Sequence, residues 1–164
     1  MFFAIFTVLL VVIDQVTKLL VRANIPLGEN VPFIPHVLQL TYVKNTCAAF
    51  SILERHTWLL TLVSAVMVVA ICWLVVKKFF VGRVGLFAAS LILAGGLGNL
   101  IDRVLFRYVT DMLETVFMEF PVFNFADGCI TVGTVLLFIY ILFLYKDDKK
   151  ESGHDSCDLP SDGN

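Results

Sequence analysis

The chain has 164 residues, of which 59% are hydrophobic and only 16% are charged, and its mean hydropathy is +0.88. Soluble domains are typically ~45–50% apolar and ~25% charged, so this composition excludes an ordinary soluble domain and an intrinsically disordered chain. The net charge is −2, with 12 basic and 14 acidic residues, and lacks the basic excess of nucleic-acid-binding proteins. The length leaves room for about four membrane spans of ~20 residues each.

Four apolar runs predict four transmembrane helices, because a helix satisfies its own backbone hydrogen bonds inside a bilayer. The first run contains Asp14 and Lys18 and has neither a basic leading region nor a small-residue cleavage site, so we interpret it as a retained span rather than a cleaved signal peptide. We interpret residues 1–146 as a single four-span membrane domain and the polar, acidic residues 147–164 as a disordered cytoplasmic tail. The expected spans are residues 2–21, 58–76, 85–102 and 127–145.

Basic residues predict the orientation of these spans. The positive-inside rule places both basic clusters in the cytoplasm, which puts both termini there and turns residues 22–57 and 102–126 outward. In these outward segments, residues 37–43 are rich in β-branched and aromatic residues and predict a strand, and the aromatic residues 117–125 predict a segment at the membrane interface. The two clusters are Lys77, Lys78 and Arg83, between the second and third spans, and Lys146, Lys149 and Lys150, after the fourth.

Ionisable residues inside the apolar runs are the informative ones, because they are costly to bury in a membrane. Asp14 and Lys18 are four residues apart and share one helix face, so they can pair. We interpret them first as a structural ion pair that locks the first span to its neighbours. Asn99 and Arg103 share a face of the third span in the same way, with Asp102 beside them.

Two acids lie at the predicted outer boundary of the membrane, Asp111 after the third span and Asp127 at the start of the fourth. Two carboxyl groups held close together cannot easily both ionise, so one of them keeps a proton. The ionised one can then take a proton from water while the protonated one polarises a peptide carbonyl, which is the chemistry of amide hydrolysis. Asp127 could instead only cap the start of the fourth helix, and the pattern alone leaves both interpretations open.

Other catalytic constellations are weaker. The histidines His36, His56 and His154 have no H-E-x-x-H spacing, so no zinc site or other metal site is predicted, and no histidine stands near a nucleophile as a serine or cysteine triad requires. A disulfide between Cys47 and Cys129 stays open, because spacing alone does not decide pairing.

Five blocks, in order, resemble those of the bacterial lipoprotein signal peptidases, also called signal peptidase II. The resemblance covers nearly all of residues 8–145. The blocks are D-Q-V-T-K (Asp14–Lys18), N-T-C-A-A-F-S (Asn45–Ser51), G-G-L-G-N-L-I-D-R (Gly95–Arg103), V-T-D-M (Val109–Met112) and F-N-F-A-D (Phe123–Asp127).

The resemblance implies an all-α membrane protein of four transmembrane helices with a small extracytoplasmic β-cradle, in the bacterial cytoplasmic membrane. It implies an aspartic endopeptidase that needs no cofactor or metal, works near the outer face, and removes the signal peptide of diacylglyceryl-modified prolipoproteins just before the lipidated cysteine. Its partners would be prolipoproteins and membrane lipids, and the cyclic peptide globomycin would inhibit it. The expected oligomeric state is a monomer.

Carried over by position, the resemblance makes Asp111 and Asp127 the catalytic pair. The residues that it implies as supporting the site are Asp14, Lys18, Asn45, Asn99, Arg103, Asn124 and Ala126.

Three positions depart from the family pattern. Cys47 stands where the family usually has Gly, Arg107 where a Gly usually precedes the V-x-D block, and Gly128 where Ser is usual. None removes a catalytic carboxylate, but together they leave room for altered substrate preference or lowered activity. Two alternative functions also stay open: a small transporter whose intramembrane charges relay protons, and a lipoprotein-binding relative without catalysis.

Overall fold

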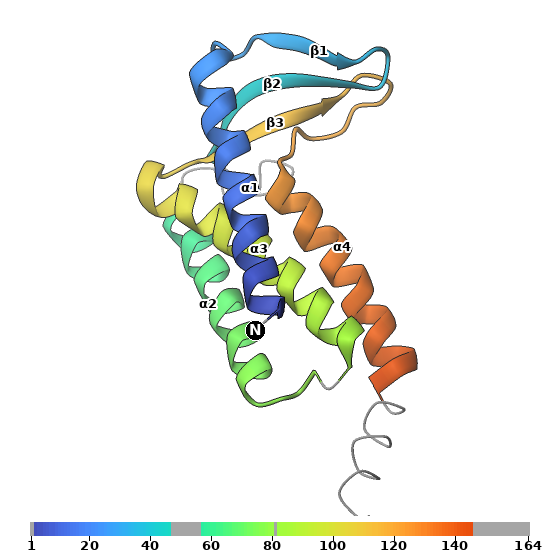
Figure 1. Cartoon of the computed structure of the whole chain (residues 1–164). Coiled ribbons are helices and arrows are strands. Elements are labelled where there is room, and N and C mark those ends of the chain that lie inside the picture. Colours follow the sequence, from blue (N-terminus) through green and yellow to red (C-terminus); the bar gives the residue numbers. More distant parts are fainter. Residues whose placement is uncertain (1, 47–56, 81, 146–164) are drawn as a thin grey trace, which may run out of the picture.

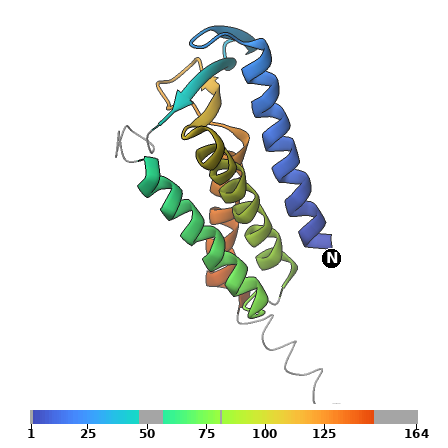
Figure 2. The ribbon, with the colours of Figure 1, turned by 90° about the vertical axis from the view of Figure 1, so that its left-hand side faces the viewer.

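Four helices stand side by side, and a small sheet lies across one end of them (Figures 1 and 2). The structure, a computed structural model, describes residues 2–46, 57–80 and 82–145, so Cys47 and the predicted tail lie outside the described residues. In chain order the elements are α1 (Phe2–Asn24), β1 (Asn30–Ile34), β2 (Leu38–Asn45), α2 (Thr57–Val76), α3 (Arg83–Phe106), β3 (Val109–Thr115), α4 (Phe125–Ile139) and the π-helical turn η2 (Tyr140–Leu144).

Helices α1, α2 and α3, and α4 continued by η2, are each long and apolar enough to cross a membrane, which confirms the predicted four-helix membrane fold. Helices α1 and α3 continue beyond the expected spans, to Asn24 and Phe106. Helix α4 begins at Phe125 rather than at residue 127, because the Asn124 side chain accepts a hydrogen bond from the Asp127 backbone N–H and so caps the helix earlier.

Helix α3 is the centre of the bundle and contacts each of the other three helices. In its most apolar stretch 61% of the residues are buried, against 17% in α1 and in α4 and 6% in α2. The apolar side chains of the outer helices therefore face outward, where lipid would cover them. Glycines let the neighbours approach α3: a Cβ on Gly95 would meet the carbonyl oxygen of Ala126 and, at 2.7 Å, the side chain of Ile130 on α4.

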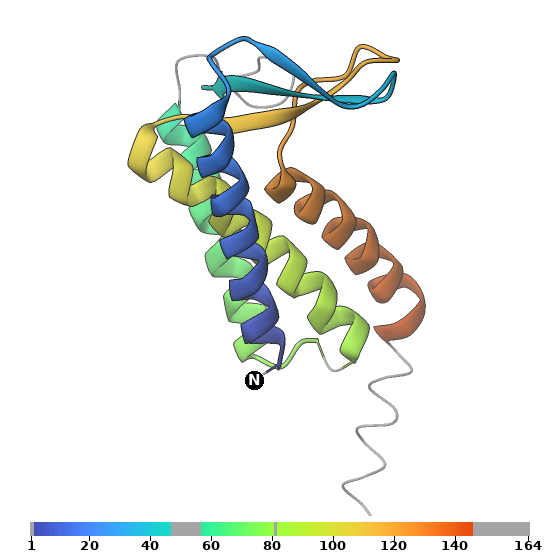
Figure 3. The same ribbon diagram turned by 45° about the horizontal axis from the view of Figure 1, so that its top comes forward.

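The sheet has the order β1-β2-β3, with both pairs antiparallel. The predicted strand at residues 37–43 is confirmed as β2. The other two strands were not predicted from the sequence, because β1 contains Pro32 and is exposed at every position, and β3 interrupts its apolar residues with Asp111. The sheet lies at the end of the bundle opposite the N-terminus (Figure 3).

Helix α3 ends in a left-handed residue, Arg107, with φ of 63°. Its backbone N–H donates to the carbonyl of Arg103 and closes the last turn. Glycine is common at this position of a helix because a side chain there costs about 1–2 kcal/mol. Arg107 thus keeps the turn that a family glycine would make, while a Cβ on Gly128 would meet open space, so both departures leave the local backbone intact.

We predict that Gly95→Ala destabilises the protein by about 1–3 kcal/mol, the usual cost of overpacking. The added methyl group would meet backbone atoms of α4, which cannot rotate away. Thermal unfolding in detergent measures the loss as a lower midpoint. Gly128→Ala is the matched control, since its methyl group has space and alanine favours a helix; an equal loss in both variants would contradict the packing argument.

Candidate active site

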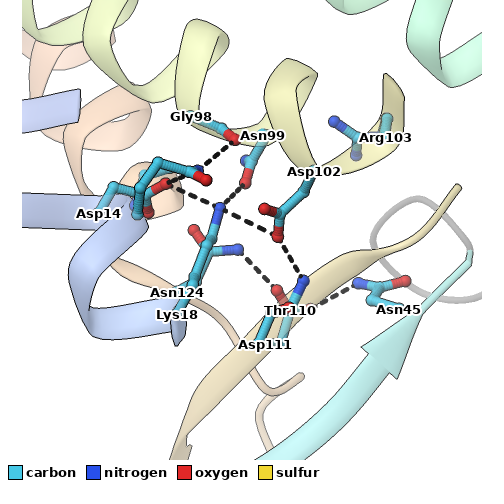
Figure 4. A network of polar contacts seen from close by, with 12 residues as sticks. Asp14, Lys18, Asn45, Gly98, Asn99, Asp102, Arg103, Thr110, Asp111 and Asn124 are labelled. Atoms are coloured by element: carbon cyan, nitrogen blue, oxygen red, sulfur yellow. Dashed lines mark hydrogen bonds and ion pairs between the residues drawn. The ribbon is translucent and has the colours of Figure 1, made fainter. Parts of the chain in front are cut away.

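Asp111 lies on β3 and its side chain is only 1% exposed. The strand register places Val43 opposite Asp111, so Asn45, two residues further along β2, is its diagonal neighbour on the same face. Asn45 Nδ2 donates to one carboxylate oxygen of Asp111 at 2.7 Å, and Asn124 Nδ2 donates to the other at 2.6 Å (Figure 4). Both oxygens of this buried carboxyl group are therefore held by amide donors.

Asp127 lies in the first turn of α4 and forms a reciprocal cap with Asn124. The Asn124 side-chain oxygen accepts from the Asp127 backbone N–H at 3.0 Å, and Asp127 Oδ2 accepts from the Asn124 backbone N–H at 3.1 Å. Asp127 Oδ1 accepts from Asn99 Nδ2 on α3 at 2.7 Å. Asp127 thus caps the helix and also lies in the polar cluster, so the two interpretations of this residue do not exclude each other.

Asn124 lies between the two acids and hydrogen-bonds to both. This arrangement depends on the return of the chain to β3 before α4 begins: the Phe123 N–H donates to the Leu113 carbonyl at 3.0 Å, and the Leu113 N–H donates to the Phe123 carbonyl at 2.8 Å. This bridge brings β3, which carries Asp111, next to the start of α4, which carries Asp127.

The two carboxyl groups influence each other electrostatically. Burial above all, together with the charge of Asp127, raises the pKa of Asp111 to about 6, although hydrogen bonds from Asn45 and Asn124 oppose both effects. Asp111 therefore holds a proton more readily than an exposed aspartate would. A pair in which one member is protonated and the other ionised is suited to general acid and base catalysis.

A cluster of buried charges lies directly behind this pair. Lys18 Nζ is 2.9 Å from Asp14, which confirms the predicted ion pair, and 3.6 Å from Asp102. Asp102 accepts from the Thr110 backbone N–H at 2.9 Å, and Arg22 is 3.5 Å from Asp102.

The cluster joins α1 to the other elements of the site. Arg22 donates to the Thr110 hydroxyl at 2.9 Å, and the Ala126 backbone N–H donates to Asp14 at 3.1 Å, so α1 is tied to β3 and α4. Arg22 and Thr110 were not predicted from the sequence to belong to the site. The position of Arg22 four residues after Lys18 was a usable signal, because the two share a helix face.

Arg103 approaches the site from the side of α2. It donates to Ser64 on α2 at 3.1 Å and interacts electrostatically with Asp127 and Asp111. Ala126 is 1% exposed and packs beside Gly98 of α3, where a larger side chain would have little room. Every residue that the sequence analysis assigned to the site therefore lies in or beside one polar cluster at the sheet end of the bundle.

Among the described residues, the buried charged side chains lie at that end of the bundle. Ser90 is a buried polar side chain nearer the start of α3, and its hydroxyl donates to the Leu86 carbonyl of its own helix. Cys129 carries a free buried thiol, whereas Cys47 is not described. Within the part of the chain that the structure describes, no three His, Cys, Asp or Glu side chains converge as metal ligands.

The chain resembles known proteins in both sequence and structure. The sequence profile of the family described as Signal peptidase (SPase) II matches residues 6–143. A lipoprotein signal peptidase of Enterococcus faecalis is 42% identical over 142 residues, which cover 87% of this chain and 88% of the relative. One of Listeria monocytogenes is 39% identical over 157 residues, covering 93% and 99%.

Two solved structures described as bacterial membrane enzymes share the fold. One has a TM-score of 0.80 at 30% identity and covers 99% of this chain and 93% of its own. The other has a TM-score of 0.79 at 33% identity and covers 87% and 93%. Since the family profile spans most of the sequence and the relatives match over nearly their full length, the chain belongs to the signal peptidase II family of membrane proteases.

Proposed function

We propose that this protein cuts the signal peptide from diacylglyceryl-modified prolipoproteins just before the lipidated cysteine, with Asp111 and Asp127 as its catalytic pair. The observation that carries this assignment is the position of Asn124, which donates to Asp111 and forms a reciprocal cap with Asp127, so that both carboxyl groups are hydrogen-bonded to the same residue. Membership of the signal peptidase II family supplies the reaction class.

In this mechanism the ionised carboxylate takes a proton from a water molecule, whose oxygen attacks the scissile carbonyl carbon. The protonated carboxyl group donates a hydrogen bond to the carbonyl oxygen and stabilises the charge that develops there. Collapse of the tetrahedral intermediate breaks the C–N bond, and the leaving amine receives a proton from the pair.

The neighbouring residues hold the pair in place. The amides of Asn45, Asn99 and Asn124 donate to the carboxylate oxygens and fix their orientation. Asp14 accepts from the Ala126 backbone N–H and so anchors the turn that carries Asp127. Arg103 has a supporting role, as an electrostatic partner of both acids.

The substrate would reach the site from the outer leaflet, with its acyl chains among the exposed apolar side chains of the helices and its peptide under the sheet. The N-terminus lies at the other end of the bundle, on the cytoplasmic side in this orientation (Figure 3). The turn between α2 and α3, which carries Lys77, Lys78 and Arg83, lies on that side too, as the positive-inside rule requires. Membrane lipids surround the protein, globomycin would compete for the same site, and the enzyme would work as a monomer.

A transporter is a poorer fit to the described residues. A proton or solute path needs polar side chains on both sides of the membrane, and the buried charges here are confined to the sheet end. A binding protein without catalysis is also a poorer fit, because both carboxyl groups of the pair are present and held by hydrogen bonds.

We predict that Asp111→Asn and Asp127→Asn each lower kcat by at least about 100-fold, the usual contribution of a general acid or base. The assay follows cleavage of a purified diacylglyceryl-modified precursor in detergent. Glu114→Gln is the matched control, since it removes an acid from the same strand whose partner is Gln39 rather than the pair. Processing at near wild-type rates by either Asp variant would refute the assignment.

The raised pKa of Asp111 predicts a pH-dependent stability. Since this acid binds its proton more tightly in the folded than in the unfolded protein, its contribution favours folding below pH 3.8 and is lost as the pH rises to about 6. We expect the unfolding midpoint to fall more between about pH 4 and about pH 7 in wild type than in Asp111→Asn. Equal pH dependence in the two proteins would contradict the burial argument.

The orientation can be tested with single cysteines in a variant without the native ones. Glu119 follows β3 at the sheet end, and Lys77 lies at the opposite end; both are exposed. We expect a membrane-impermeant maleimide to label Glu119→Cys but not Lys77→Cys in intact spheroplasts. Labelling both after lysis is the control, and the reverse pattern in intact spheroplasts would overturn the proposed orientation.

A further inference from the structure

The amide of Asn99 connects the buried charge cluster to the carboxylate pair. Its Oδ1 lies 2.9 Å from Lys18 Nζ, and its Nδ2 donates to Asp127 Oδ1 at 2.7 Å (Figure 4 shows the contact with Lys18). Lys18 is 0% exposed and Asn99 is 4% exposed, so water does not compete freely for these contacts.

The chemistry of these groups permits only one orientation of the amide. An ammonium group has three donors and no acceptor, so the side of Asn99 that faces Lys18 has to be the carbonyl oxygen. The NH2 group then faces Asp127 and can only donate. While Lys18 holds the amide in this way, Asp127 Oδ1 has to act as an acceptor.

We propose that Lys18 is a positioning residue that acts through the amide of Asn99 to keep Asp127 as the ionised member of the pair and leave the proton on Asp111. This inference rests on the proposed function of the pair. It assigns the two roles in the reaction: Asp127 is the base that takes the proton from water, and Asp111 is the acid that polarises the carbonyl.

The surroundings of the two acids agree with this assignment. Asp127 accepts from the Asn124 backbone N–H as well as from Asn99, and lies in the first turn of α4, where the helix dipole favours a negative charge. Asp111 also accepts two hydrogen bonds, from the amides of Asn45 and Asn124, but it lies on a strand without such a dipole and is 1% exposed, so the helix dipole and burial separate the two acids. Burial above all raises the pKa of Asp111, against the hydrogen bonds from Asn45 and Asn124 and the charge of Lys18, so Asp111 keeps a proton to higher pH than an exposed aspartate does.

The charges around the pair do not replace the effect of the hydrogen bond. Arg103, on α3, interacts electrostatically with both acids and with Asp102, so it does not favour ionisation of Asp127 alone. Lys18 and Arg22 face Asp14 and Asp102, so this cluster of two cations and two carboxylates has no net charge. Lys18 therefore acts on Asp127 chiefly by orienting Asn99, which could otherwise turn its oxygen toward a protonated Asp127.

The test compares Asp14→Asn with the double variant Asp14→Asn/Lys18→Met. Removing Lys18 alone would leave two buried carboxylates facing one cation and could prevent folding. The double variant removes one charge of each sign, and the Asp14→Asn change keeps a side-chain oxygen that can accept from Ala126. The two proteins differ in the side chain at position 18, and therefore in its contacts with Asn99 and Asp102 and in one positive charge.

We expect the double variant to have a kcat about tenfold below that of Asp14→Asn, with little change in KM, as for the loss of one hydrogen bond to a charged group. The acidic limb of its kcat/KM profile should move to higher pH by about one unit, because Asp127 becomes easier to protonate. A purely structural role of Lys18 would lower the amount of folded enzyme without moving this limb. Superimposable profiles for the folded proteins would overturn the inference.

Asn99→Asp supplies a second test that keeps Lys18. Two facing carboxyl groups have to share a proton, so we expect the acidic limb to move upward in this variant as well. An unmoved limb would count against the inference even if the double variant does not fold. This outcome can be separated from the proposed function. If Asp111→Asn and Asp127→Asn are inactive but the acidic limb does not move in either test, the role of Lys18 is rejected and the catalytic pair stands.

Discussion

The structure depends on one buried interaction, the ammonium group of Lys18 between Asp14, Asp102 and Asn99. An isolated charge at this depth would cost several kcal/mol, so each charged group of the cluster is stable only while its partners are in place. Because the partners come from α1 and α3, and because Asp102 also accepts from the backbone of Thr110, the cluster joins two helices to the sheet. It also lies directly behind the pair of acids, so the same contacts that hold the fold together set the geometry of the site.

Close packing around α3 is the second condition for this site. The carboxylate of Asp14 lies where a Cβ of Gly98 would be, and the backbone of Ala126 lies where one of Gly95 would be. The main chain of α4 can therefore approach closely enough for the Ala126 N–H to bond to Asp14 and for Asn99 to reach Asp127. Small residues in α3 thus serve the chemistry indirectly, by allowing polar groups of three helices to meet within hydrogen-bonding distance.

The separation of buried charged groups from apolar surface makes the two ends of the helix bundle chemically different. The outer helices present apolar side chains over most of their length, and the buried ionisable groups gather at the sheet end. A protease that acts on a lipid-anchored peptide needs such an arrangement, since the acyl chains remain in the bilayer while the peptide bond has to reach water. Asp111 is a buried acid on a strand, whereas Asp127 caps the start of a helix. These unlike environments favour different protonation states of the two carboxyl groups.

The sequence by itself determined the four helices, because long apolar runs have no other stable form in a bilayer, and it determined the ion pair of Asp14 and Lys18 through their spacing on one helix face. The blocks that resemble signal peptidase II also predicted Asp111 and Asp127 as the catalytic pair. Local pattern did not reveal β1 or β3, because an exposed edge strand with a proline and a strand with a buried acid lack the usual alternation. Only the tertiary structure placed Asn124 between the two acids and Lys18 behind Asn99, since hydrogen bonds between residues 81 positions apart follow from how helices pack and not from their order in the chain.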